Sequence, residues 1–421
     1  MKAVLLCAGE GTRLRPLTDT TPKAMLPLDG APLIDHTLHW LRWHGITDVA
    51  INLHHLPHAI TGYVGDGSRW GLRVWYSHEP ELLGTAGALL PMADWLTEDR
   101  KPFVVAYGDK YMQADLTALV EFHRRKAALV TIAVHETDRP RGAGLVKMEG
   151  GGRIVKYIEK PDEPFSKWAN AGLYVCDWEI VPRLPGWTPC DWGKDVFERI
   201  VQSRYRQGMF YAHPLPGLAM DIGTPARYEL AQRLAEQPGA IFVDRDGTIN
   251  EMVPQEHVTT REQFRFIPGA LDALAILAQK SEAPIVIWTN QPAIGRGEAT
   301  QEQVDDLHDW MVEQIVAAGG RVDAVYVCPH AHGTGCDCRK PAPGMLLQAA
   351  RELGVNLAKS AVVGDTRFDL RAGWAAGVRE CYLTLTGWPL KSYPEQTGGH
   401  RYTVTTSLLK AAHKMVEAQL V

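Results

Sequence analysis

The chain has 421 residues, of which 45% are hydrophobic and 22% are charged, and its formal net charge is −5. This length favours two or three domains over one, and the composition is typical of a soluble globular protein. The negative charge offers no basic surface for nucleic acid or for an anionic membrane. A bound phosphate must therefore be held by a few placed cations and backbone amides.

The N-terminal apolar run stops at Gly9 and charged residues follow at once, which is not the pattern of a secretory signal peptide. No apolar run reaches the ~18 residues that a membrane span needs. We therefore expect a cytoplasmic protein with reduced cysteines. The oligomeric state stays open, with a homodimer as one option.

Short apolar runs alternate with helical patterns along the chain. In the first half, strands are predicted at 2–8, 48–53, 72–77, 102–109 and 129–136, and helices at 32–45, 84–96, 116–126 and 225–237. A second series has strands at 241–246, 284–290, 323–328, 360–365 and 380–387. The alternation predicts an α/β protein with two doubly wound, Rossmann-like domains in tandem, at 1–236 and 238–421.

A glycine-rich turn follows the first predicted strand, in AGEGTRLRPLT, and a Pro-Lys pair comes shortly after it. Glycine lets backbone amides approach phosphates, although a plain strand-to-helix turn would look similar. Further motifs follow: LLGTAGAL at 82–89, GD at 108–109, EKP at 159–161, NAG at 170–172, DWGKDVF at 191–197 and MDIGTP at 220–225. Together they resemble the sugar-1-phosphate nucleotidyltransferases, over essentially all of residues 1–236.

This resemblance implies that a sugar phosphate oxygen attacks the α-phosphorus of a nucleoside triphosphate and that pyrophosphate leaves. Such a reaction needs positioning and charge neutralisation rather than a covalent nucleophile. The resemblance implies that Asp109 and Asp221 hold Mg²⁺, that Arg13 and Lys23 neutralise phosphates, and that Lys160 meets the sugar phosphate. Further substrate contacts are implied for Gly9, Gly11, Thr12, Gly84, Thr85, Glu159, Asn170 and Gly172.

Alternatives remain for three of these residues. Asp109 could be an ordinary turn residue at a strand end, and Glu159 and Lys160 a solvated surface pair. Lys110 departs from the family, where a neutral residue commonly follows the metal carboxylate. The sequence leaves open whether Lys110 points away from the site or modifies metal affinity.

In the second half, IFVDRDGTIN is an apolar strand that ends in two aspartates. Such carboxylates can share a cation, one attacking phosphorus while the other exchanges protons, although an Asx turn could have the same sequence. The segments WTNQPAIGRG at 288–297, CRKP at 338–341 and VVGDTRFD at 362–369 follow in order. These motifs resemble the haloacid dehalogenase (HAD) superfamily phosphatases over 238–388, and within them the subgroup containing heptose-1,7-bisphosphate 7-phosphatase and histidinol phosphatase.

The resemblance implies that Asp244 is the nucleophile, that Asp246 is the general acid and base, and that Lys340 neutralises the substrate phosphate. Thr289 and Asn290 would bind that phosphate. The implied Mg²⁺ ligands are Asp244, Asp246 and Asp365. Arg296 and Arg339 are implied substrate contacts.

Four potential zinc ligands occur within residues 328–338, in the order C-x-H-x₅-C-x-C: Cys328, His330, Cys336 and Cys338. They form a full tetrahedral set, so the zinc would be structural rather than catalytic. The same subgroup carries such a loop, whereas a disulfide is disfavoured in the cytoplasm. The zinc would orient Arg339 and Lys340 toward the active site, and His332 would be a spare, solvated histidine.

The pairing of the two halves adds information. A heptose bisphosphate phosphatase releases a sugar 1-phosphate, which a nucleotidyltransferase consumes, so the resemblances imply consecutive steps toward an activated heptose for lipopolysaccharide or another surface glycan. The first half looks closest to mannose- and heptose-1-phosphate guanylyltransferases, which favours GTP. The alternatives are another phosphosugar with UTP, ATP or dTTP, or one half acting as a non-catalytic binding module.

Overall fold

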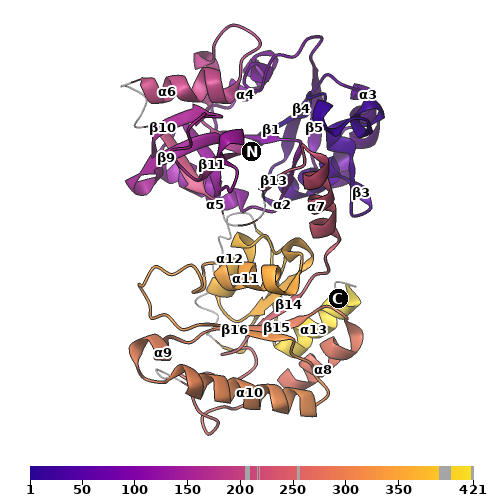
Figure 1. Cartoon of the computed structure of the whole chain (residues 1–421). Helices are drawn as coiled ribbons and strands as arrows, with labels where there is room; N and C mark the ends of the chain where they lie inside the picture. Colours follow the sequence, from indigo (N-terminus) through magenta and orange to yellow (C-terminus); the bar gives the residue numbers. More distant parts are fainter. Residues whose placement is uncertain (204–208, 216, 218, 254–256, 388–399, 419–421) are drawn as a thin grey trace. The chain divides into compact units, whose positions relative to one another are not determined.

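The computed structural model describes residues 1–203, 209–215, 217, 219–253, 257–387 and 400–418. The chain divides into two compact units, Met1–Arg233 and Leu234–Val421. Figure 1 shows strands and helices in both units, so the α/β class is confirmed for each.

Unit 1 is built on a nine-stranded sheet in the order β5-β4-β1-β6-β11-β8-β12-β10-β9. Its strands are β1 (Lys2–Leu6), β4 (Asp48–Leu53), β5 (Arg73–His78), β6 (Phe103–Tyr107), β8 (Val130–Glu136), β9 (Gly144–Glu149), β10 (Arg153–Glu159), β11 (Trp168–Cys176) and β12 (Phe210–Pro214). The first four strands in that order are parallel. β11 runs antiparallel to both β6 and β8, so the sheet is mixed, and β9 to β12 are strands that the sequence patterns did not indicate.

The described part of unit 1 also contains two short ribbons and the α-helices α1 to α7. The ribbons pair β2 (Pro27–Leu28) with β3 (Ala31–Pro32) and β7 (Lys110–Met112) with β13 (Ala219–Asp221). The helices are α1 (Leu17–Thr20), α2 (Leu33–Trp43), α3 (Pro57–Val64), α4 (Ala93–Thr97), α5 (Leu116–Lys126), α6 (Glu198–Gln202) and α7 (Pro225–Glu236), which continues into unit 2. The helix predicted at 84–96 is instead a 3₁₀ helix, Gly87–Met92, followed by α4, and Pro91 inside it lacks the N–H that an α-helix would use.

The sheet of unit 1 has a separate core on each face because side chains alternate along a strand. Ala3 and Leu5 of β1 pack in one cluster, together with Leu38 and Leu41 of α2. Val4, between them, packs in the other cluster. The sheet is therefore buried on both sides, as doubly wound folds require.

Unit 2 contains a six-stranded, all-parallel sheet in the order β16-β15-β14-β17-β18-β19. Its strands are β14 (Ile241–Asp244), β15 (Ile285–Asn290), β16 (Ala324–Cys328), β17 (Ala361–Gly364), β18 (Glu380–Thr384) and β19 (Thr403–Thr405). Its helices are α8 (Ala270–Lys280), α9 (Pro292–Arg296), α10 (Gln301–Ala317), α11 (Gly344–Leu353), α12 (Arg367–Ala375) and α13 (Leu408–Glu417). The chain order reverses at β14, and ligands of open α/β sheets bind at the carboxyl ends of the strands at such a point.

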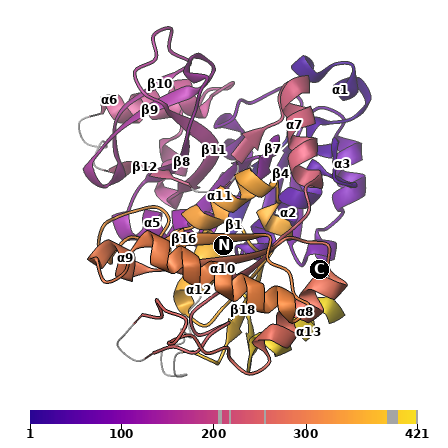
Figure 2. The ribbon, with the colours of Figure 1, turned by 60° about the horizontal axis from the view of Figure 1, so that its bottom comes forward.

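Two helices of unit 2, α10 and α12, begin at capping boxes. Thr300 and Gln303 form a capping box at the start of α10, and Thr366 and Asp369 form another at the start of α12. Apolar residues of α8, α10 and α13 share one core with β14 and β15, and Figure 2 shows these three helices close together.

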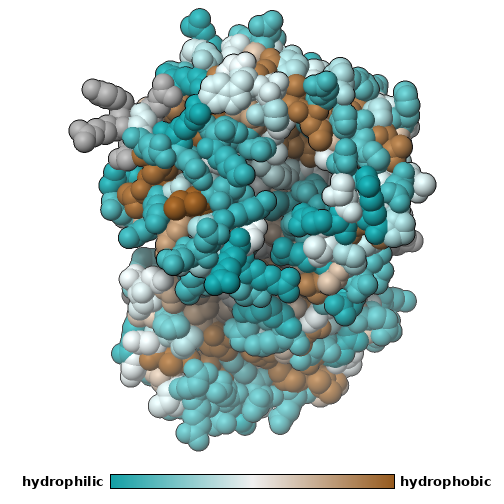
Figure 3. Space-filling model, turned by 45° about the horizontal axis from the view of Figure 1, so that its top comes forward, coloured by the Kyte–Doolittle hydropathy of each residue, from teal (hydrophilic) through white to brown (hydrophobic). Residues whose placement is uncertain are grey.

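The visible face in Figure 3 is covered mostly by hydrophilic residues, with hydrophobic ones in scattered patches. Within the described ranges, none of the helices combines the length and the apolar character that crossing a lipid bilayer requires.

Candidate active sites

Unit 1 contains a cavity of about 370 Å³ beside the carboxyl ends of β1 and β6. Among the residues that line it are these predicted site residues: Gly9, Gly11, Thr12, Arg13, Lys23, Gly84, Thr85 and Asp109. Asp221 lies next to it through Lys23 and Gly223. The structure thus brings together the residues predicted for the triphosphate and for Mg²⁺.

The glycine-rich turn has no room for a larger residue at Gly11. Gly11 has a φ of 66°, and a Cβ there would lie 2.9 Å from Cγ2 of Thr18. The Thr18 hydroxyl donates to the Gly11 carbonyl (2.9 Å), and the Cys7 N–H donates to Oδ1 of Asn52 (2.7 Å). These contacts fix the loop as a backbone-lined wall, which suits a phosphate chain.

Lys23 joins the two carboxylates predicted to hold Mg²⁺. Its ammonium lies 2.6 Å from Asp109 Oδ2 and 3.1 Å from Asp221 Oδ1, and the residue is only 8% exposed. Burial alone would raise the pKa of Asp221, but the ammonium groups of Lys23 and Lys110 outweigh burial and lower it. Oδ1 of Asp109 is buried and has no hydrogen-bond partner among the described residues. A carboxylate pair with a spare oxygen fits the donor set that Mg²⁺ prefers.

A buried glutamate that the sequence reading missed supports the nucleoside-side loop. Oε1 of Glu79 accepts from the Asn52 side chain (2.8 Å) and Oε2 accepts from the Leu83 N–H (3.0 Å). The Thr85 N–H and hydroxyl both donate to Oδ1 of Asp191, at 3.1 Å each. The sequence did contain one sign of this polar contact, because the polar residue Asn52 follows three apolar residues in a predicted buried strand.

Sugar-side residues form a hydrogen-bonded chain next to the cavity. Tyr157 donates to Oε2 of Glu159 (2.7 Å), and the Asn170 side-chain amide donates to the hydroxyls of Tyr157 (3.2 Å) and Tyr174 (2.9 Å). Tyr174 in turn donates to Tyr107, which lines the cavity (3.3 Å). These hydrogen bonds link residues predicted to bind the sugar to Tyr107 at the wall of the cavity through aromatic side chains.

Glu159 sits between two glycines that leave room for its carboxylate. A Cβ at Gly144 would lie 2.5 Å from its Oε2, and a Cβ at Gly193 would lie 2.4 Å from the same atom. Glu159 and Lys160 line a separate hollow formed by residues 156 and 158–165, rather than the cavity of about 370 Å³. Lys160 has a φ of 48°, an uncommon backbone conformation for a non-glycine residue.

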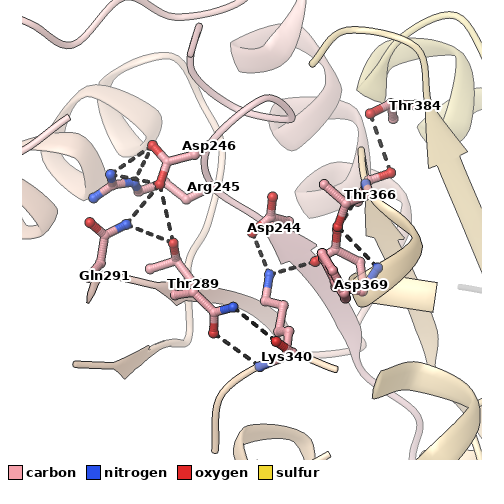
Figure 4. Close-up of polar contacts among 12 residues, drawn as sticks. Asp244, Arg245, Asp246, Thr289, Gln291, Lys340, Thr366, Asp369 and Thr384 are labelled. Atoms are coloured by element: carbon pink, nitrogen blue, oxygen red, sulfur yellow. Dashed lines mark hydrogen bonds and ion pairs between the residues drawn. The ribbon is translucent and has the colours of Figure 1, made fainter. Parts of the chain in front are cut away.

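In unit 2, Lys340 joins the nucleophile predicted at Asp244 to a second carboxylate (Figure 4). Its buried ammonium lies 2.5 Å from Asp244 Oδ1, 2.7 Å from Asp369 Oδ1 and 3.9 Å from the Trp288 ring centroid. Burial raises the pKa of Asp244 to about 7 even though Lys340 opposes the shift. Asp369 was part of a recognised motif, but no role was predicted for it.

The carboxylate of Asp246 is turned toward Arg245 (Figure 4). Arg245 is fully buried and its Nη2 lies 2.7 and 2.9 Å from the two carboxylate oxygens. Gln291 donates to the same carboxylate (2.8 Å) and to the Thr289 hydroxyl (2.9 Å). Burial would raise the pKa of Asp246, but Arg245 outweighs burial and lowers it. Neither Arg245 nor Gln291 was predicted, although Arg245 lies between the two aspartates of the motif.

Three buried carboxylates of unit 2 can hold one cation. Oxygen atoms of Asp244, Asp365 and Asp369 lie within 4.8 Å of one another. Both oxygens of Asp365 are buried without a hydrogen-bond partner in the described part of the chain, and burial raises the pKa of Asp365 to about 9. These residues fit Mg²⁺, whose charge would favour the ionised carboxylates. The carboxylate of Asp246, predicted as a ligand, is not part of this cluster.

The four predicted zinc ligands come together. Their ligand atoms lie within 4.8 Å of one another. Sγ of Cys338 lies 3.2 Å from Cys328 Sγ, 3.6 Å from Cys336 Sγ and 3.2 Å from His330 Nδ1. Tetrahedral zinc with bonds of about 2.0–2.3 Å places its ligand atoms about 3.3–3.8 Å apart. The 3.6 Å separation lies within that range and the two of 3.2 Å lie just below it, so the set suits zinc.

The zinc-ligand loop is fastened to the end of β15. The Lys340 N–H donates to Oδ1 of Asn290 (3.1 Å), and the Asn290 side-chain amide donates to the Lys340 carbonyl (3.4 Å). Arg339 donates to the His330 carbonyl (3.1 Å). Asn290, predicted to bind phosphate, therefore uses its side chain to place Lys340.

A cavity of about 290 Å³ adjoins this loop. Asn290, Arg339 and Lys340 line it, and so do His332, which was expected to be a solvated spare, and Phe368. Arg296 does not line this cavity; its Nη1 lies 3.3 Å from His257 Nε2 and 3.8 Å from Glu298.

Comparison with known proteins identifies both units. A model of the nucleotidyl transferase family matches residues 2–237. The chain belongs to this family. A model of the HAD-hydrolase-like family matches residues 337–407, so the two resemblances that the motifs predicted are confirmed.

Curated relatives match the N-terminal part of this nucleotidyl transferase family member. A UTP–glucose-1-phosphate uridylyltransferase from Synechocystis is 34% identical over 246 residues, which cover 55% of this chain and 63% of the relative. A mannose-1-phosphate guanylyltransferase from Mycobacterium tuberculosis is 33% identical over 241 residues, which cover 56% and 66%. The chain thus spans slightly less than two thirds of these relatives.

Solved structures resemble each part. A structure described as a glucose-1-phosphate thymidylyltransferase from Bacillus anthracis, in complex with sucrose, is 26% identical, with a TM-score of 0.51, and the match covers 56% of this chain and 95% of that one. A D,D-heptose 1,7-bisphosphate phosphatase from B. bronchiseptica, complexed with magnesium and phosphate, is 33% identical, with a TM-score of 0.39, and the match covers 43% and 99%.

Proposed function

We propose that the chain is a bifunctional enzyme of activated-heptose synthesis. Its C-terminal unit would remove the C7 phosphate from D-glycero-D-manno-heptose 1,7-bisphosphate. Its N-terminal unit would then transfer a guanylyl group from GTP to the heptose 1-phosphate and release pyrophosphate. The observation that carries this proposal is that one chain contains two complete constellations, Lys23 with Asp109 and Asp221, and Lys340 with Asp244 and Asp369.

In the phosphatase step, a carboxylate oxygen of Asp244 attacks the C7 phosphorus and the bond to the sugar oxygen breaks. Lys340 offsets the charge of the phosphate, and Asp246 gives a proton to the leaving oxygen. Water then attacks the aspartyl phosphate while Asp246 takes its proton, which restores both side chains. Arg245 lowers the pKa of Asp246, so the resting carboxylate has to take up a proton before it can give one to the leaving oxygen. Once that proton has been given, the carboxylate is ionised, as the second role requires. Mg²⁺ held by Asp244, Asp365 and Asp369 would supply further neutralisation.

In the transfer step, the sugar phosphate oxygen attacks the α-phosphorus and the bond to pyrophosphate breaks. The glycine-rich turn and Arg13 would hold the triphosphate, and Lys23 would orient Asp109 and Asp221. Mg²⁺ on those two carboxylates would offset the charge that both substrates bring. The structural zinc would act only through the loop that presents Lys340.

The proposal also specifies the two substrates, a heptose and GTP. The order of the two chemistries supports heptose, because a bisphosphate that loses one phosphate leaves the sugar 1-phosphate that the other unit needs. Mannose-1-phosphate guanylyltransferases among the relatives support GTP. UTP with another phosphosugar is the second candidate, because a uridylyltransferase is equally similar.

The test supplies the purified chain with the α- or β-anomer of the heptose 1,7-bisphosphate, Mg²⁺ and each of GTP, UTP, ATP and dTTP. We expect phosphate release from C7, pyrophosphate release with GTP, and a nucleotide-heptose by mass spectrometry. The kcat/KM for the α-bisphosphate should exceed that for the β-anomer by at least tenfold, which corresponds to about 1.4 kcal/mol. Removal of the C1 phosphate first, or a strong β preference, would contradict the coupled sequence while leaving both chemistries possible.

A further inference from the structure

Lys110 shares one side of a ribbon with the carboxylates of the transferase site. β7 and β13 are antiparallel, and Lys110 lies directly opposite Asp221 in their register. Side chains of directly opposed residues point to the same face. Lys110 therefore points toward the side of Asp221 and not away from it, which answers the question that the sequence left open.

The side chain of Lys110 crosses toward the sugar side, over Gly172 of β11. A Cβ on Gly172 would lie 2.6 Å from Cε of Lys110 and 3.3 Å from its Nζ, so any larger residue would displace the lysine. The ring of Tyr107 closes the same space, 3.1 Å from that position. The register of β11 against β8 shifts between Asn170 and Tyr174, which places Gly172 in a bulge. The bulge and the missing side chain of Gly172 together leave the space that the Lys110 side chain occupies.

The ammonium of Lys110 has no hydrogen bond or ion pair with any residue in the described part of the chain. The nearby carboxylates are instead bound by Lys23, at 2.6 Å from Asp109 and 3.1 Å from Asp221. Lys110 is half-buried, and although the charges of Asp109 and Asp221 act on it, neither carboxylate is hydrogen-bonded to its ammonium, so its N–H donors remain for another partner. The site thus holds one cation in direct contact with its carboxylates and a second cation that is near them but not bonded to them.

We propose that Lys110 binds the phosphate of the acceptor sugar phosphate, on the Gly172 side of the Asp109 and Asp221 pair. The inference rests on the proposed transferase function and adds a residue to it. Two anionic substrates must approach each other before the acceptor oxygen can attack the α-phosphorus. A cation on the acceptor side reduces their repulsion and holds the acceptor phosphate in place, while Lys23 stays with the carboxylates.

The test compares Lys110→Met and Lys110→Arg with the wild type, with Lys147→Met on the exposed part of β9 as the matched control. Pyrophosphate release is measured with heptose 1-phosphate or mannose 1-phosphate as acceptor. We expect Lys110→Met to raise the KM for the acceptor at least tenfold and to leave the KM for GTP within twofold. Lys110→Arg should recover part of the loss, and Lys147→Met should match the wild type.

Two kinetic outcomes would overturn the inference. Unchanged KM values in Lys110→Met would show that the ammonium contacts no substrate. A rise in the KM for GTP, or in the Mg²⁺ concentration for half-maximal rate, without a rise for the acceptor would place Lys110 on the triphosphate or the metal.

A binding measurement separates this inference from the proposed function. If the wild type transfers no nucleotide to any sugar 1-phosphate, the proposed function fails, and calorimetry with inorganic phosphate then tests Lys110. It is done with Mg²⁺ in a Lys340→Met background, which removes the buried lysine of the other site. Lys110→Met should weaken phosphate binding to unit 1 at least tenfold, and an unchanged Kd would overturn the inference.

Discussion

Lys340 forms ion pairs with two buried carboxylates, Asp244 and Asp369. Because Lys340 is buried as well, we expect a substitution there to be costly. Burial would lower the pKa of Lys340, but Asp244 and Asp369 outweigh burial and raise it. We expect Lys340→Met, in EDTA, to lower the free energy of unfolding of unit 2 by about 3–5 kcal/mol, because two carboxylates lose their cation. Urea denaturation measures this loss. Mg²⁺ should restore much of the stability but not the phosphatase activity, and equal stability with and without Mg²⁺ would contradict the assigned cation cluster.

Arg245 would act as a positioning residue for Asp246, the group proposed to transfer protons. Its Nη1 donates to Nε2 of His308 (2.9 Å) and its Nη2 donates to the Val258 carbonyl (2.8 Å), so the guanidinium cannot follow Asp246 if that side chain moves. We expect Arg245→Met to lower kcat for phosphate release at least tenfold with little change in KM, because general acid–base catalysis contributes about 10²–10⁴-fold. His308→Gln, which can still accept from Arg245, should lose much less. Equal losses in both variants would indicate a general folding defect instead.

The sequence predicted the chemistry of single residues better than their geometry. Asp244 and Lys340 followed from ordered motifs, and the structure places them in contact. The side-chain contacts of Asp246 and the part played by Asp369 could not be read from spacing, because each depends on where a second strand end or helix start lies in space. For the same reason Glu79 was missed, since it acts from a position outside every recognised motif.

At the scale of single elements, the zinc-ligand loop should determine phosphatase activity although its metal does not contact the substrate. We expect about one zinc per chain by elemental analysis and loss of that zinc in Cys336→Ser. Phosphate release should fall strongly, because the segment that carries Arg339 and Lys340 loses its anchor while the Asn290 contacts alone remain. Pyrophosphate release by unit 1 is the internal control. A zinc-free preparation with full phosphatase activity would contradict this role.

Helix α5 and strand β8 share a buried histidine that makes unit 1 sensitive to acid. Nδ1 of His123 lies 3.0 Å from the Thr131 hydroxyl, and burial lowers the pKa of His123 to about 4. Because this folded-state pKa lies below the unfolded value of about 6.5, the stabilisation is present above that value and is lost as the pH falls toward 4. We expect the urea midpoint of the wild type to fall more than that of His123→Gln between pH 7 and pH 4.5. Parallel curves would refute the assignment.

The parallel strands could be predicted because both faces are buried and the runs are mostly apolar, as in β4 and β15. β9 and β10 gave weaker signals, since each is partly exposed and carries lysines among its apolar residues. β11 contains Asn170 and Gly172, which were interpreted as a substrate-binding motif, so the segment around them was not predicted as a strand. Element type therefore followed from burial at β4 and β15, whereas β9 and β10 were missed because they are partly exposed and β11 because its polar motif stood out.

At the scale of the whole molecule, the two constellations come from different chain segments and should be separable by mutation. We expect Asp244→Asn to abolish phosphate release and to leave transfer from a supplied sugar 1-phosphate nearly intact. Asp109→Ala should do the opposite, because that carboxylate belongs to the Lys23 group. Assays of phosphate and pyrophosphate on each variant decide the matter. Loss of both activities in a folded variant would contradict two independent sites.

The strand order of unit 2 also bears on how the protein is made. β14 is the first strand of that unit to leave the ribosome, yet it lies in the middle of the sheet, and its Asp244 is paired through Lys340 with Asp369 far downstream. The transferase carboxylates are complete once Asp221 has been synthesised. At about 5–20 residues per second, the ribosome needs on the order of ten seconds more to reach Asp369. The half proposed to act second is therefore the first to be finished, so a nascent chain can acquire its transferase before its phosphatase.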